Sequence, residues 1–332
     1  MTRKIIAIEE HFGFPEISRA GHQETMRLCP HFEDSYLKAY PASHVPVPGS
    51  MQDLADGRIA DMDKNGIDIE ILSSSSTQLI VSEDAVDICR SANDRLAEAI
   101  KLYPGRFYGY ACLPSIDPQA SAAELERCVK ELGFKGANFF GRTNEKFLDD
   151  PMFEPILAKA EELQVPLYLH PGFPSQKVTE ACYTGFSDIV STRFACSAWG
   201  WHADDGVQLI RLILAGVFDR HPGLTVIAGH WGEFVPFYLE RLETALPKMI
   251  TGLQKEFSEY FQTSIYITPS GMFNQAQLDF CVKTVGIDRL IFSVDYPFIS
   301  NEGARNFIEQ AELSEEDKDK FAFKNAEKVF CL

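Results

Sequence analysis

The chain has 332 residues, 45% hydrophobic and 24% charged, which is the composition of a globular protein with one large core or two small ones. Its formal net charge of -17, without any basic run, argues against nucleic acids or anionic lipids as partners. No apolar stretch approaches the roughly 18 residues of a membrane span, and no signal-peptide pattern is visible. We therefore expect a cytoplasmic protein whose scattered cysteines, none in a CxxC pair, are buried apolar residues.

Ionisable residues directly follow the first apolar run of the chain. Residues 5–8 have the pattern of a strand buried on both faces, and Glu9, Glu10 and His11 come next. Alternate residues of a strand project to the same side, so Glu9 and His11 point into one pocket while Glu10 faces away. This spacing suits two ligands of one metal ion, and a solvated acidic loop is the alternative.

A long segment, residues 13–50, follows and carries five prolines. Loops of this length inside a compact domain are usually functional or cover a site. We interpret this segment as an insertion over the mouth of the first strand, with one helical piece around residues 17–27.

Strand and helix patterns then alternate to the end of the chain. Strands are expected at 68–74, 107–113, 136–140, 166–170, 224–230, 264–268 and 290–295. Helices are expected at 51–66, 83–102, 118–132, 151–163, 204–220, 233–246 and 274–285, and in the last residues. With the first strand, this order predicts a (β/α)8 TIM barrel formed by a single domain, residues 1–332. An open doubly wound sheet is less consistent, because no Gly-rich turn follows the first strand.

Residues that can bind metal end several of these strands. In such barrels the active site lies at the carboxyl ends of the strands. Glu9 and His11 end the first strand, and His170, His230 and Asp295 end the fifth, sixth and eighth. One such residue could be a satisfied polar group, but their recurrence at one register predicts a metal site. Imidazole and carboxylate ligands suit Zn2+, Mn2+ or Fe2+ better than Ca2+, and the lack of thiolates argues against a structural zinc site.

Four short motifs are spread from the first strand to the last. They are Glu9-x-His11, the LHPGFP motif around His170, Gly229-His-Trp-Gly-Glu233 and Phe292-Ser-Val-Asp-Tyr-Pro297. Together they resemble the amidohydrolase superfamily, in its branch of nonoxidative decarboxylases that includes γ-resorcylate, 2,3-dihydroxybenzoate and aminocarboxymuconate semialdehyde decarboxylases. Hydrolytic members typically show His-x-His at the first strand and often a carboxylated lysine at the fourth. Here the fourth strand, GANFFG, ends without lysine.

The resemblance implies the roles of the site residues. It implies one divalent ion, Zn2+ or Mn2+, held by Glu9, His11, His170 and Asp295. His230 would lie beside the metal and be oriented by Glu233, three residues further along a helical turn. Asp295 would donate a proton to the substrate ring, with His230 stabilising the intermediate.

Other residues are candidates for contact with the substrate. Phe140, Phe173 and Tyr296 adjoin the metal ligands in the sequence, where a flat aromatic acid can stack on them, and packing in the core at the barrel rim is the alternative. Arg241 matches a family position that reaches the site from a neighbouring part of the assembly, and a surface arginine is the alternative. The implied assembly is a homodimer or homotetramer. His202 is either a further polar contact or a solvated loop residue, and the second interpretation is preferred because a loop histidine is more often solvated.

Two positions differ from the pattern of the resorcylate group. Phe140 stands where relatives commonly have asparagine, and Gly172 stands where an arginine is frequent. Both differences make the expected pocket less polar.

The implied activity is that of a carbon-carbon lyase. It would decarboxylate a hydroxybenzoate-like aromatic, or related unsaturated, carboxylic acid by protonating the ring carbon and releasing CO2. A metal-dependent hydrolase of a lactone or ester, with His230 or Asp295 as base, is the alternative. A binding barrel without catalysis would require an empty or malformed metal site.

Overall fold

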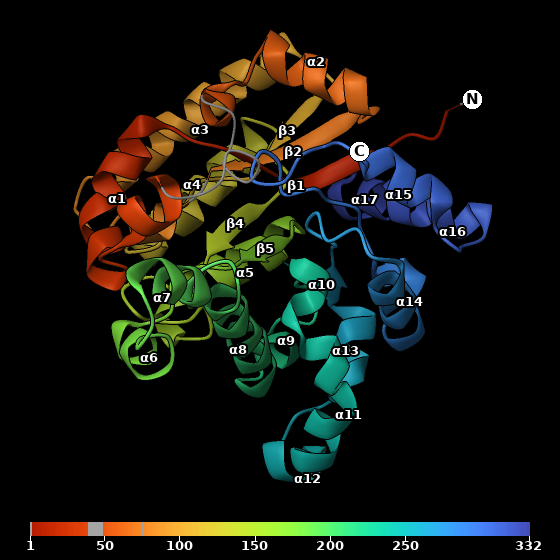
Figure 1. The fold of residues 1–332 in the computed structure, drawn as a ribbon. Helices are drawn as coiled ribbons and strands as arrows, with labels where there is room; N and C mark the ends of the chain where they lie inside the picture. Colours follow the sequence, from red (N-terminus) through yellow and green to blue (C-terminus); the bar gives the residue numbers. More distant parts are fainter. Residues whose placement is uncertain (1, 39–48, 75) are drawn as a thin grey trace.

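The computed structural model describes residues 2–38, 49–74 and 76–332, and buried parallel strands lie at its centre (Figure 1). Every residue of these strands except Tyr108 is buried, as expected for strands covered on both faces. The strands are β1 (Ile6–Phe12), β2 (Ile69–Ser74), β3 (Phe107–Gly109), β4 (Ala137–Phe140), β5 (Leu167–His170), β6 (Val226–Ala228) and β7 (Ile265–Ile267).

Backbone hydrogen bonds arrange the strands in a ring. Strands β1 to β3 form one parallel sheet, and β4 to β7 form another in chain order. An isolated bridge between Ala111 and Ala137 joins the two sheets. On the other side, Leu290 bridges to Ile267, and the Asp295 amide donates to the Glu9 carbonyl at 2.9 Å. The segment 290–296 therefore lies between β7 and β1.

The eighth strand predicted at 290–295 is not a regular strand in the structure. Only Leu290 makes a bridge, and Asp295 has a φ of 71°, which a strand does not allow. The amides of Val294 and Tyr296 donate to the side chain of Glu10, both at 2.9 Å. The carboxylate of Glu10 therefore replaces part of the backbone hydrogen bonding between strands that would define a regular strand. The α/β class of the prediction is confirmed. The segment 290–296 occupies the expected place of the eighth strand, but the prediction that it is a regular strand is wrong.

Helices cover the outside of the strands (Figure 1). Their bounds agree with the sequence periodicity for most of the chain. They are α1 (Pro15–Leu28), α2 (Asp56–Asn65), α3 (Ala85–Leu102), α4 (Pro118–Lys130), α5 (Glu154–Leu163), α6 (Gln176–Cys182), α7 (Asp188–Ala195), α8 (Gly200–Leu214), α9 (Val217–Arg220), α10 (His230–Glu233), α11 (Val235–Ala245), α12 (Lys248–Thr251), α13 (Phe257–Thr263), α14 (Gln275–Thr284), α15 (Ala304–Gln310), α16 (Glu315–Asp319) and α17 (Asn325–Phe330).

Several helical segments differ from the prediction. The helix expected at 204–220 begins earlier, at Gly200, and is divided into α8 and α9 at Gly216, which has a φ of 65°. The helix expected at 233–246 is α11, separated from α10 by Phe234 with a φ of 66°. Residues with positive φ cannot continue a right-handed helix, so each marks a break. Helices α6, α7, α12 and α13 were not predicted.

The segment 13–50 contains a longer helix than expected. The helical piece predicted around 17–27 is α1, which has Pro15 in its first turn. A π-helix at Phe32–Lys38 follows, and a short 3-10 helix, Ser50–Gln52, begins at the last residue of the segment. Residues 39–48 lie outside the described part of the chain.

Two hydrophobic cores lie on the two faces of the strands. Ile6 and Ile8 belong to a core with Tyr110 and Tyr168, whereas Ile5 and Ala7 pack into the larger core that includes the helices. This alternation follows from the two-residue period of a strand. The inner core gives the site described below a packed floor.

Six of the eight cysteines are buried, as predicted, and Cys182 and Cys331 are exposed. Within the described residues, none of the helices has the length and apolar character needed to cross a bilayer.

Candidate metal centre and active site

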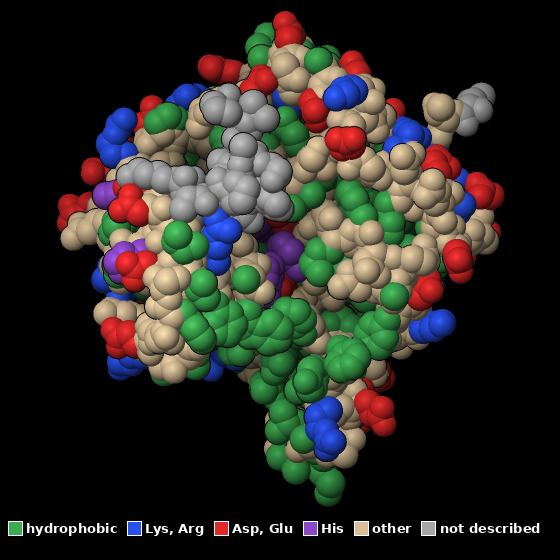
Figure 2. Space-filling model, in the orientation of Figure 1, with side chains coloured by type: hydrophobic (Ala, Val, Ile, Leu, Met, Phe, Trp, Pro, Cys, Tyr) green, Lys and Arg blue, Asp and Glu red, His purple; other side chains and the backbone are tan. Residues whose placement is uncertain are grey.

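Four ionisable side chains converge at one end of the ring of strands. Each offers one ligand atom, and the four atoms lie within 4.8 Å of one another. The Nε2 atom of His11 is 2.8 Å from Asp295 Oδ1, and His170 Nε2 is 3.5 Å from Glu9 Oε1. All four residues are buried, and Figure 2 shows histidine side chains at the bottom of a hollow on this face. The structure thus brings together Glu9, His11, His170 and Asp295, which are the four predicted ligands.

Hydroxyl groups hold one oxygen of Glu9 and leave the other one unpartnered. Glu9 Oε2 accepts a hydrogen bond from Ser270 Oγ, from Ser293 Oγ at 3.1 Å and from Thr268 Oγ1 at 3.3 Å. Glu9 Oε1 is buried without a hydrogen-bond partner. The carboxylate is therefore fixed in rotation, with Oε1 directed toward the other three ligands.

Each of the two imidazoles is oriented through its other nitrogen. Nδ1 of His11 lies 2.9 Å from Ser73 Oγ, and Nδ1 of His170 donates to the carbonyl of Pro171 at 3.0 Å. A carbonyl only accepts, so the neutral form of His170 carries its proton on Nδ1 and has a lone pair on Nε2.

The four ligand atoms fit a cation. Among the described residues, Glu9 Oε1, His11 Nε2, His170 Nε2 and Asp295 Oδ1 are all buried, and none makes a hydrogen bond of good geometry; the 2.8 Å separation of His11 Nε2 and Asp295 Oδ1 is a close approach of two ligand atoms. Buried polar atoms are almost always satisfied, so four unpartnered atoms at one point are exceptional. One divalent ion would satisfy all four, and two imidazoles with two carboxylates suit a borderline ion.

Electrostatics at this cluster also favours a cation. Burial lowers the pKa of His11, which favours the neutral imidazole that binds metal. Burial lowers the pKa of His170 as well, but Asp295 and Glu9 outweigh it and raise that pKa. Burial opposes the ionisation of Asp295, whereas contacts with His11 and His170 hold its pKa below the usual range. The two carboxylates thus create a negative potential where the ligand atoms meet.

Glu10 joins the two ends of the chain at the site. As predicted, it faces away from the ligands, where it accepts the amides of Val294 and Tyr296 on either side of Asp295. Burial and the neighbouring Glu70 raise the pKa of Glu10. Its contacts fix the strained backbone of Asp295 beside the first strand. The sequence suggested no such role, because the pattern of one strand does not reveal what lies on its far side.

His230 lies next to the four ligands and is oriented by Glu233, as the sequence predicted. Its Nδ1 is 2.8 Å from Glu233 Oε1, and its Nε2 is 3.9 Å from Asp295 Oδ2. The intervening turn is not a regular helix, because His230, Trp231 and Glu233 have φ values of 47°, 59° and 51°. Such backbone strain is common at functional sites.

The interpretation of His202 as a solvated loop residue is wrong. Its side chain is 14% exposed and lies in α8, with Nδ1 2.9 Å from Glu233 Oε2. Helix α8 begins at Gly200 rather than at residue 204, so His202 is in its first turn and meets α10. The less favoured interpretation of His202 as a further polar contact is the correct one, although no pattern in the sequence identified Glu233 as its partner.

Aromatic side chains surround the cluster. The ring of Phe140 packs on that of His170 with centroids 4.0 Å apart. Phe173 contacts the rings of Phe32, at 5.1 Å, and Trp201, at 5.5 Å. Phe140 therefore forms an apolar surface on one of the ligands, whereas Phe173 packs within a separate group of three aromatic rings.

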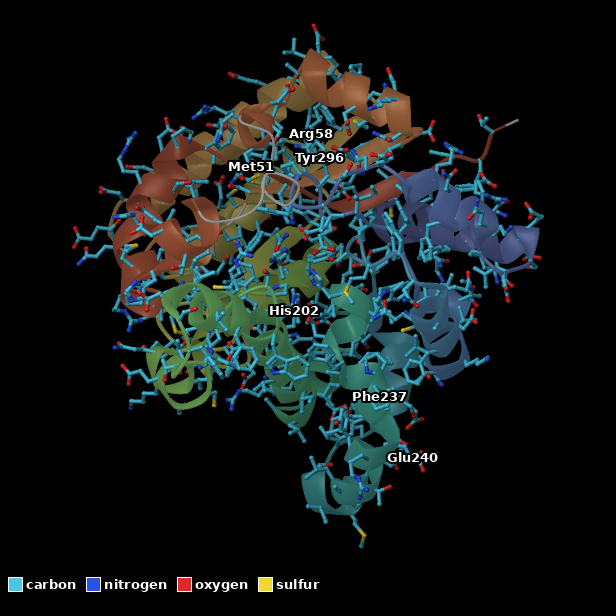
Figure 3. The ribbon with its side chains drawn as sticks, in the orientation of Figure 1. Met51, Arg58, His202, Phe237, Glu240 and Tyr296 are labelled. Carbon is cyan, nitrogen blue, oxygen red and sulfur yellow. The ribbon has the colours of Figure 1, made fainter. Side chains whose placement is uncertain are left out.

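Tyr296 packs against an arginine, whereas Arg241 is exposed. Tyr296 lies beneath the guanidinium of Arg58, which is 4.8 Å from the centre of its ring (Figure 3). Burial raises the pKa of Tyr296 to about 12. Arg241 is exposed on α11, and none of the described contacts of the four ligands involves it.

Gly172 lies against another glycine. A Cβ atom at Gly172 would be 2.8 Å from Gly141 Cα, and Gly141 itself has a φ of 65°. The backbones that follow β4 and β5 therefore approach too closely for a side chain at residue 172. This contact accounts for the glycine in the Pro-Gly-Phe-Pro motif.

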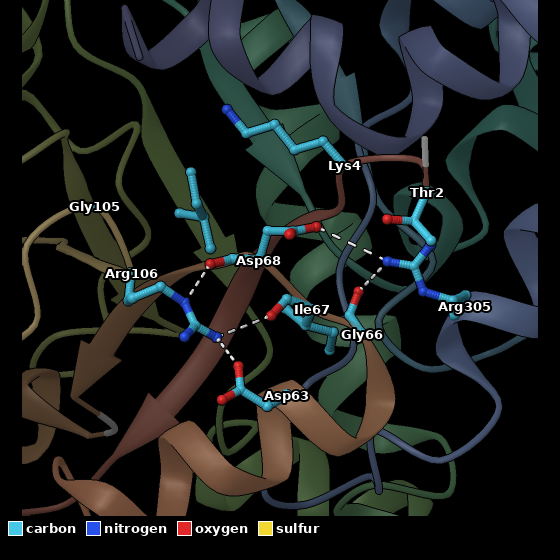
Figure 4. Close-up of a pocket in the computed structure, with 10 residues that line it drawn as sticks. Thr2, Lys4, Asp63, Gly66, Ile67, Asp68, Gly105, Arg106 and Arg305 are labelled. Carbon is cyan, nitrogen blue, oxygen red and sulfur yellow. Dashed lines mark hydrogen bonds and ion pairs between the residues drawn. The ribbon is translucent and has the colours of Figure 1, made fainter.

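A separate cavity of about 620 Å³ lies at the opposite ends of β1 and β2 (Figure 4). Its arginines are engaged within the protein. Arg106 contacts Asp63 at 2.7 Å and Arg305 donates to the carbonyl of Gly66. These interactions fit a structural role at the amino-terminal face of the strands.

Comparisons with known proteins relate the whole chain to metal-dependent decarboxylases. The family profile described as amidohydrolase matches residues 49–332. The decarboxylase orsB of Emericella nidulans is 34% identical over 98% of this chain and 97% of its own length. The γ-resorcylate decarboxylase of a Rhizobium species is 32% identical over 98% of each chain. The crystal structure of 5-carboxyvanillate decarboxylase from Novosphingobium aromaticivorans, complexed with manganese and 4-hydroxy-3-methoxy-5-nitrobenzoic acid, has a TM-score of 0.91 and 30% identity, and the match covers 99% of this chain and 96% of that one.

Proposed function

Because the chain belongs to the amidohydrolase family, in its branch of nonoxidative decarboxylases, we propose that it is a metal-dependent carbon-carbon lyase. Its substrate is a hydroxybenzoate-like aromatic, or related unsaturated, carboxylic acid, and its products are CO2 and the decarboxylated compound. One observation carries this proposal, namely four buried and unpartnered ligand atoms that converge within 4.8 Å. Relatives that match nearly the whole chain are decarboxylases, which supports the choice of reaction.

The metal is one divalent ion, Mn2+ or Zn2+, held by Glu9, His11, His170 and Asp295. The manganese in the 5-carboxyvanillate decarboxylase crystal structure supports Mn2+. When bound, the ion would attract electrons from the carboxylate and the adjacent phenol oxygen of the substrate. The hydroxyl groups that donate hydrogen bonds to Glu9, and the contact between Ser73 and His11, would keep the ligands in place.

Protonation of the ring carbon must precede the loss of CO2, because direct loss would leave an aryl anion. We assign the proton donor as Asp295, whose contacts with His11 and His170 favour its carboxylate form before substrate binds. His230 Nε2 lies 3.9 Å from Asp295 Oδ2, beyond direct hydrogen-bond distance, so a proton would pass from it to Asp295 through one water or after a small movement of either side chain. The new C–H bond takes this proton, the C–C bond to the carboxylate breaks, and its electron pair restores the aromatic ring. The sum is one proton consumed and one CO2 released.

Aromatic side chains would hold the substrate ring. We assign Phe140, Phe173 and Tyr296 to this role. Phe140 covers the ring of His170, and Phe173, three residues after His170 in the sequence, belongs to a group of three aromatic side chains. Apolar walls would exclude water from the reacting carbon and strengthen the electrostatic interactions at the metal.

Arg241 would act from a second copy of the chain, in a homodimer or homotetramer. It is exposed on α11. The same helix and α12 carry the exposed apolar side chains of Phe237, Tyr238, Met249 and Ile250. Figure 2 shows apolar side chains over this protruding part of the molecule. Exposed apolar patches mark interaction sites, so burial of this one against another copy would bring Arg241 to a substrate carboxylate.

The domain assignment also belongs to this proposal. We treat residues 1–332 as one (β/α)8 barrel domain with the segment 13–50 over the site. The contact of Phe32 with Phe173 and the hydrogen bond from the Gly13 amide to the Met51 carbonyl, 2.6 Å, support this placement. A cytoplasmic location remains a prediction.

The reaction class can be tested with two substrate panels. Protein loaded with Mn2+ is incubated with 2-hydroxybenzoates and, separately, with lactones. We expect one CO2 and one hydroxyarene for each acid consumed, and no opening of lactones. Lactone opening without CO2 release would identify a hydrolase instead. Elemental analysis that finds no bound metal after loading would indicate a binding protein.

A further inference from the structure

A second polar cluster lies behind His230, on the side away from the four ligands. Both oxygens of Glu233 are occupied, Oε1 by His230 Nδ1 at 2.8 Å and Oε2 by His202 Nδ1 at 2.9 Å. Glu233 is 1% exposed, and the two imidazole rings lie with centroids 4.4 Å apart. The orientation of His230 therefore depends on a carboxylate that His202 also holds.

The contacts of His202 require a proton on each ring nitrogen. Nδ1 faces the carboxylate of Glu233, and Nε2 is 3.0 Å from the carbonyl oxygen of Ser197. Neither an ionised carboxylate nor a carbonyl can donate, so each hydrogen bond needs an N–H of the ring. An imidazole with two N–H groups is the cation.

The surrounding charges are consistent with this cation. Glu233 faces it from α10, and Asp205 lies on its own helix. Asp204, the other acid of that helix, is paired with Arg142, and within the described part of the chain His230 is the remaining ionisable group in contact with the ring. Burial lowers the pKa of His202, but Glu233 outweighs it and raises that pKa to about 9. Burial opposes the ionisation of Glu233, and the charges of His230 and His202 lower its pKa below the usual value.

We propose that His202 is a positioning residue for the reaction, an imidazole protonated at neutral pH that holds Glu233 as an ionised and rotationally fixed carboxylate. Glu233 in turn orients His230 toward the substrate. Without His202, a buried carboxylate would keep only one of its two hydrogen bonds and would lose its counter-charge. The role of His202 rests on the proposed decarboxylase activity, whereas its protonation state does not.

The protonation state can be measured by nitrogen NMR on the histidine rings. The sample is the wild-type protein loaded with diamagnetic Zn2+, and the His202 signals are assigned by their loss in His202→Gln. We expect two protonated ring nitrogens at pH 7.5 and a transition at about pH 9. A neutral ring at pH 7.5 would overturn the proposal whether or not the protein has the proposed activity.

Kinetics tests the positioning role. Loss of an outer partner of a catalytic group typically costs 10- to 100-fold, so we expect kcat to fall about 10-fold in His202→Gln and about 100-fold in His202→Phe, with KM little changed. Glutamine keeps one N–H donor for Glu233, and phenylalanine keeps only the shape. Equal kcat in the wild type, His202→Gln and His202→Phe would contradict the role.

The matched control is His221→Gln. His221 is also buried with both nitrogens on acceptors, Glu161 at 2.8 Å and Glu154 at 2.7 Å, but none of its described contacts involves the cluster. We expect His221→Gln to change stability and leave kcat unchanged. An equal fall of kcat in both glutamine variants would indicate a general structural effect and overturn the proposal.

The pH dependence separates this role from metal binding by the same side chains. His202, His230 and Glu233 also have the spacing of a metal site, which would require unprotonated imidazoles. A histidine pKa raised from 6.5 to about 9 stabilises the folded protein fully below pH 6.5, and the effect is lost as the pH rises through 9. Loss of the His202 proton would also remove the counter-charge of Glu233. We therefore expect kcat to decline above pH 9 in the wild type and no such decline in His202→Gln. A second bound metal ion that is lost in His202→Gln would overturn the proposal.

Discussion

At the scale of single residues, the candidate site is organised by the atoms that do not face the metal position. Each of Glu9, His11 and His170 uses one polar atom to contact a hydroxyl or carbonyl group and leaves another free. A ligand that is already oriented loses little conformational freedom when the ion binds. The hydroxyl groups around Glu9 should therefore contribute to metal affinity although they do not contact the metal.

Substitution Ser270→Ala tests this contribution. It removes one of the three hydroxyl donors of Glu9 Oε2, and we expect metal affinity to fall 10- to 100-fold. The measurement is isothermal titration of metal-free protein with Mn2+. Ser121→Ala is the control, since Ser121 is equally buried but belongs to α4, and its hydroxyl has no described partner. Unchanged affinity in Ser270→Ala would contradict the account.

The sequence predicted the convergence of the four ligands because each lies in a motif near the end of an expected strand. Their placement needs only the parallel order of the strands. His202 and the contacts of Glu10 depend instead on where α8 begins and on how a chain end packs against β1. Such features come from tertiary packing, to which periodicity along the chain is insensitive.

At the scale of elements, the join between β1 and the segment 290–296 positions the last ligand. Strand periodicity predicted the regular strands, whose two faces are both buried. It failed for 290–296, because an apolar run does not reveal that Glu10 takes the place of a neighbouring strand. The breaks at Gly216 and Phe234 were missed for a similar reason, since a positive φ at a helix end is set by the local turn.

Substitution Glu10→Gln should weaken this join. An amide can accept only one of the two backbone N–H groups, those of Val294 and Tyr296, so we expect a loss of about 1–3 kcal/mol in the free energy of unfolding. The measurement is urea unfolding of the metal-free protein. Glu83→Gln, at an exposed position, should change this free energy by less than about 0.5 kcal/mol. Equal stability of the two variants would contradict the role of Glu10.

At the scale of the whole molecule, the exposed apolar side chains of α11 and α12 are unusual for a chain with a net charge of -17. Composition indicates a protein that is well hydrated overall, whereas Phe237 and Met249 are 73% and 91% exposed. We expect a partner, such as a second copy, to bury these groups. In that assembly Arg241 would contact the carboxylate of the substrate. The sequence contained Arg241 as a motif position, but composition alone does not locate an interface.

Substitutions Phe237→Glu and Met249→Glu test this interface. We expect the mass measured by light scattering to be at least twice 37.3 kDa for the wild type and about 37.3 kDa for the double variant. Decarboxylase activity should fall together with the oligomer, as it should in Arg241→Ala. Leu102→Glu, which changes a residue 74% exposed on α3, is the control and should remain oligomeric. A monomeric wild type would exclude the interface.

The most direct test joins metal content to reaction. Metal-free protein is titrated with Mn2+, and CO2 release from a carboxyl-labelled 2-hydroxybenzoate is measured against the amount of metal bound. The account predicts activity that rises in proportion to bound metal and saturates at one ion per chain. Activity without metal, or saturation only at two ions per chain, would contradict a single centre formed by Glu9, His11, His170 and Asp295.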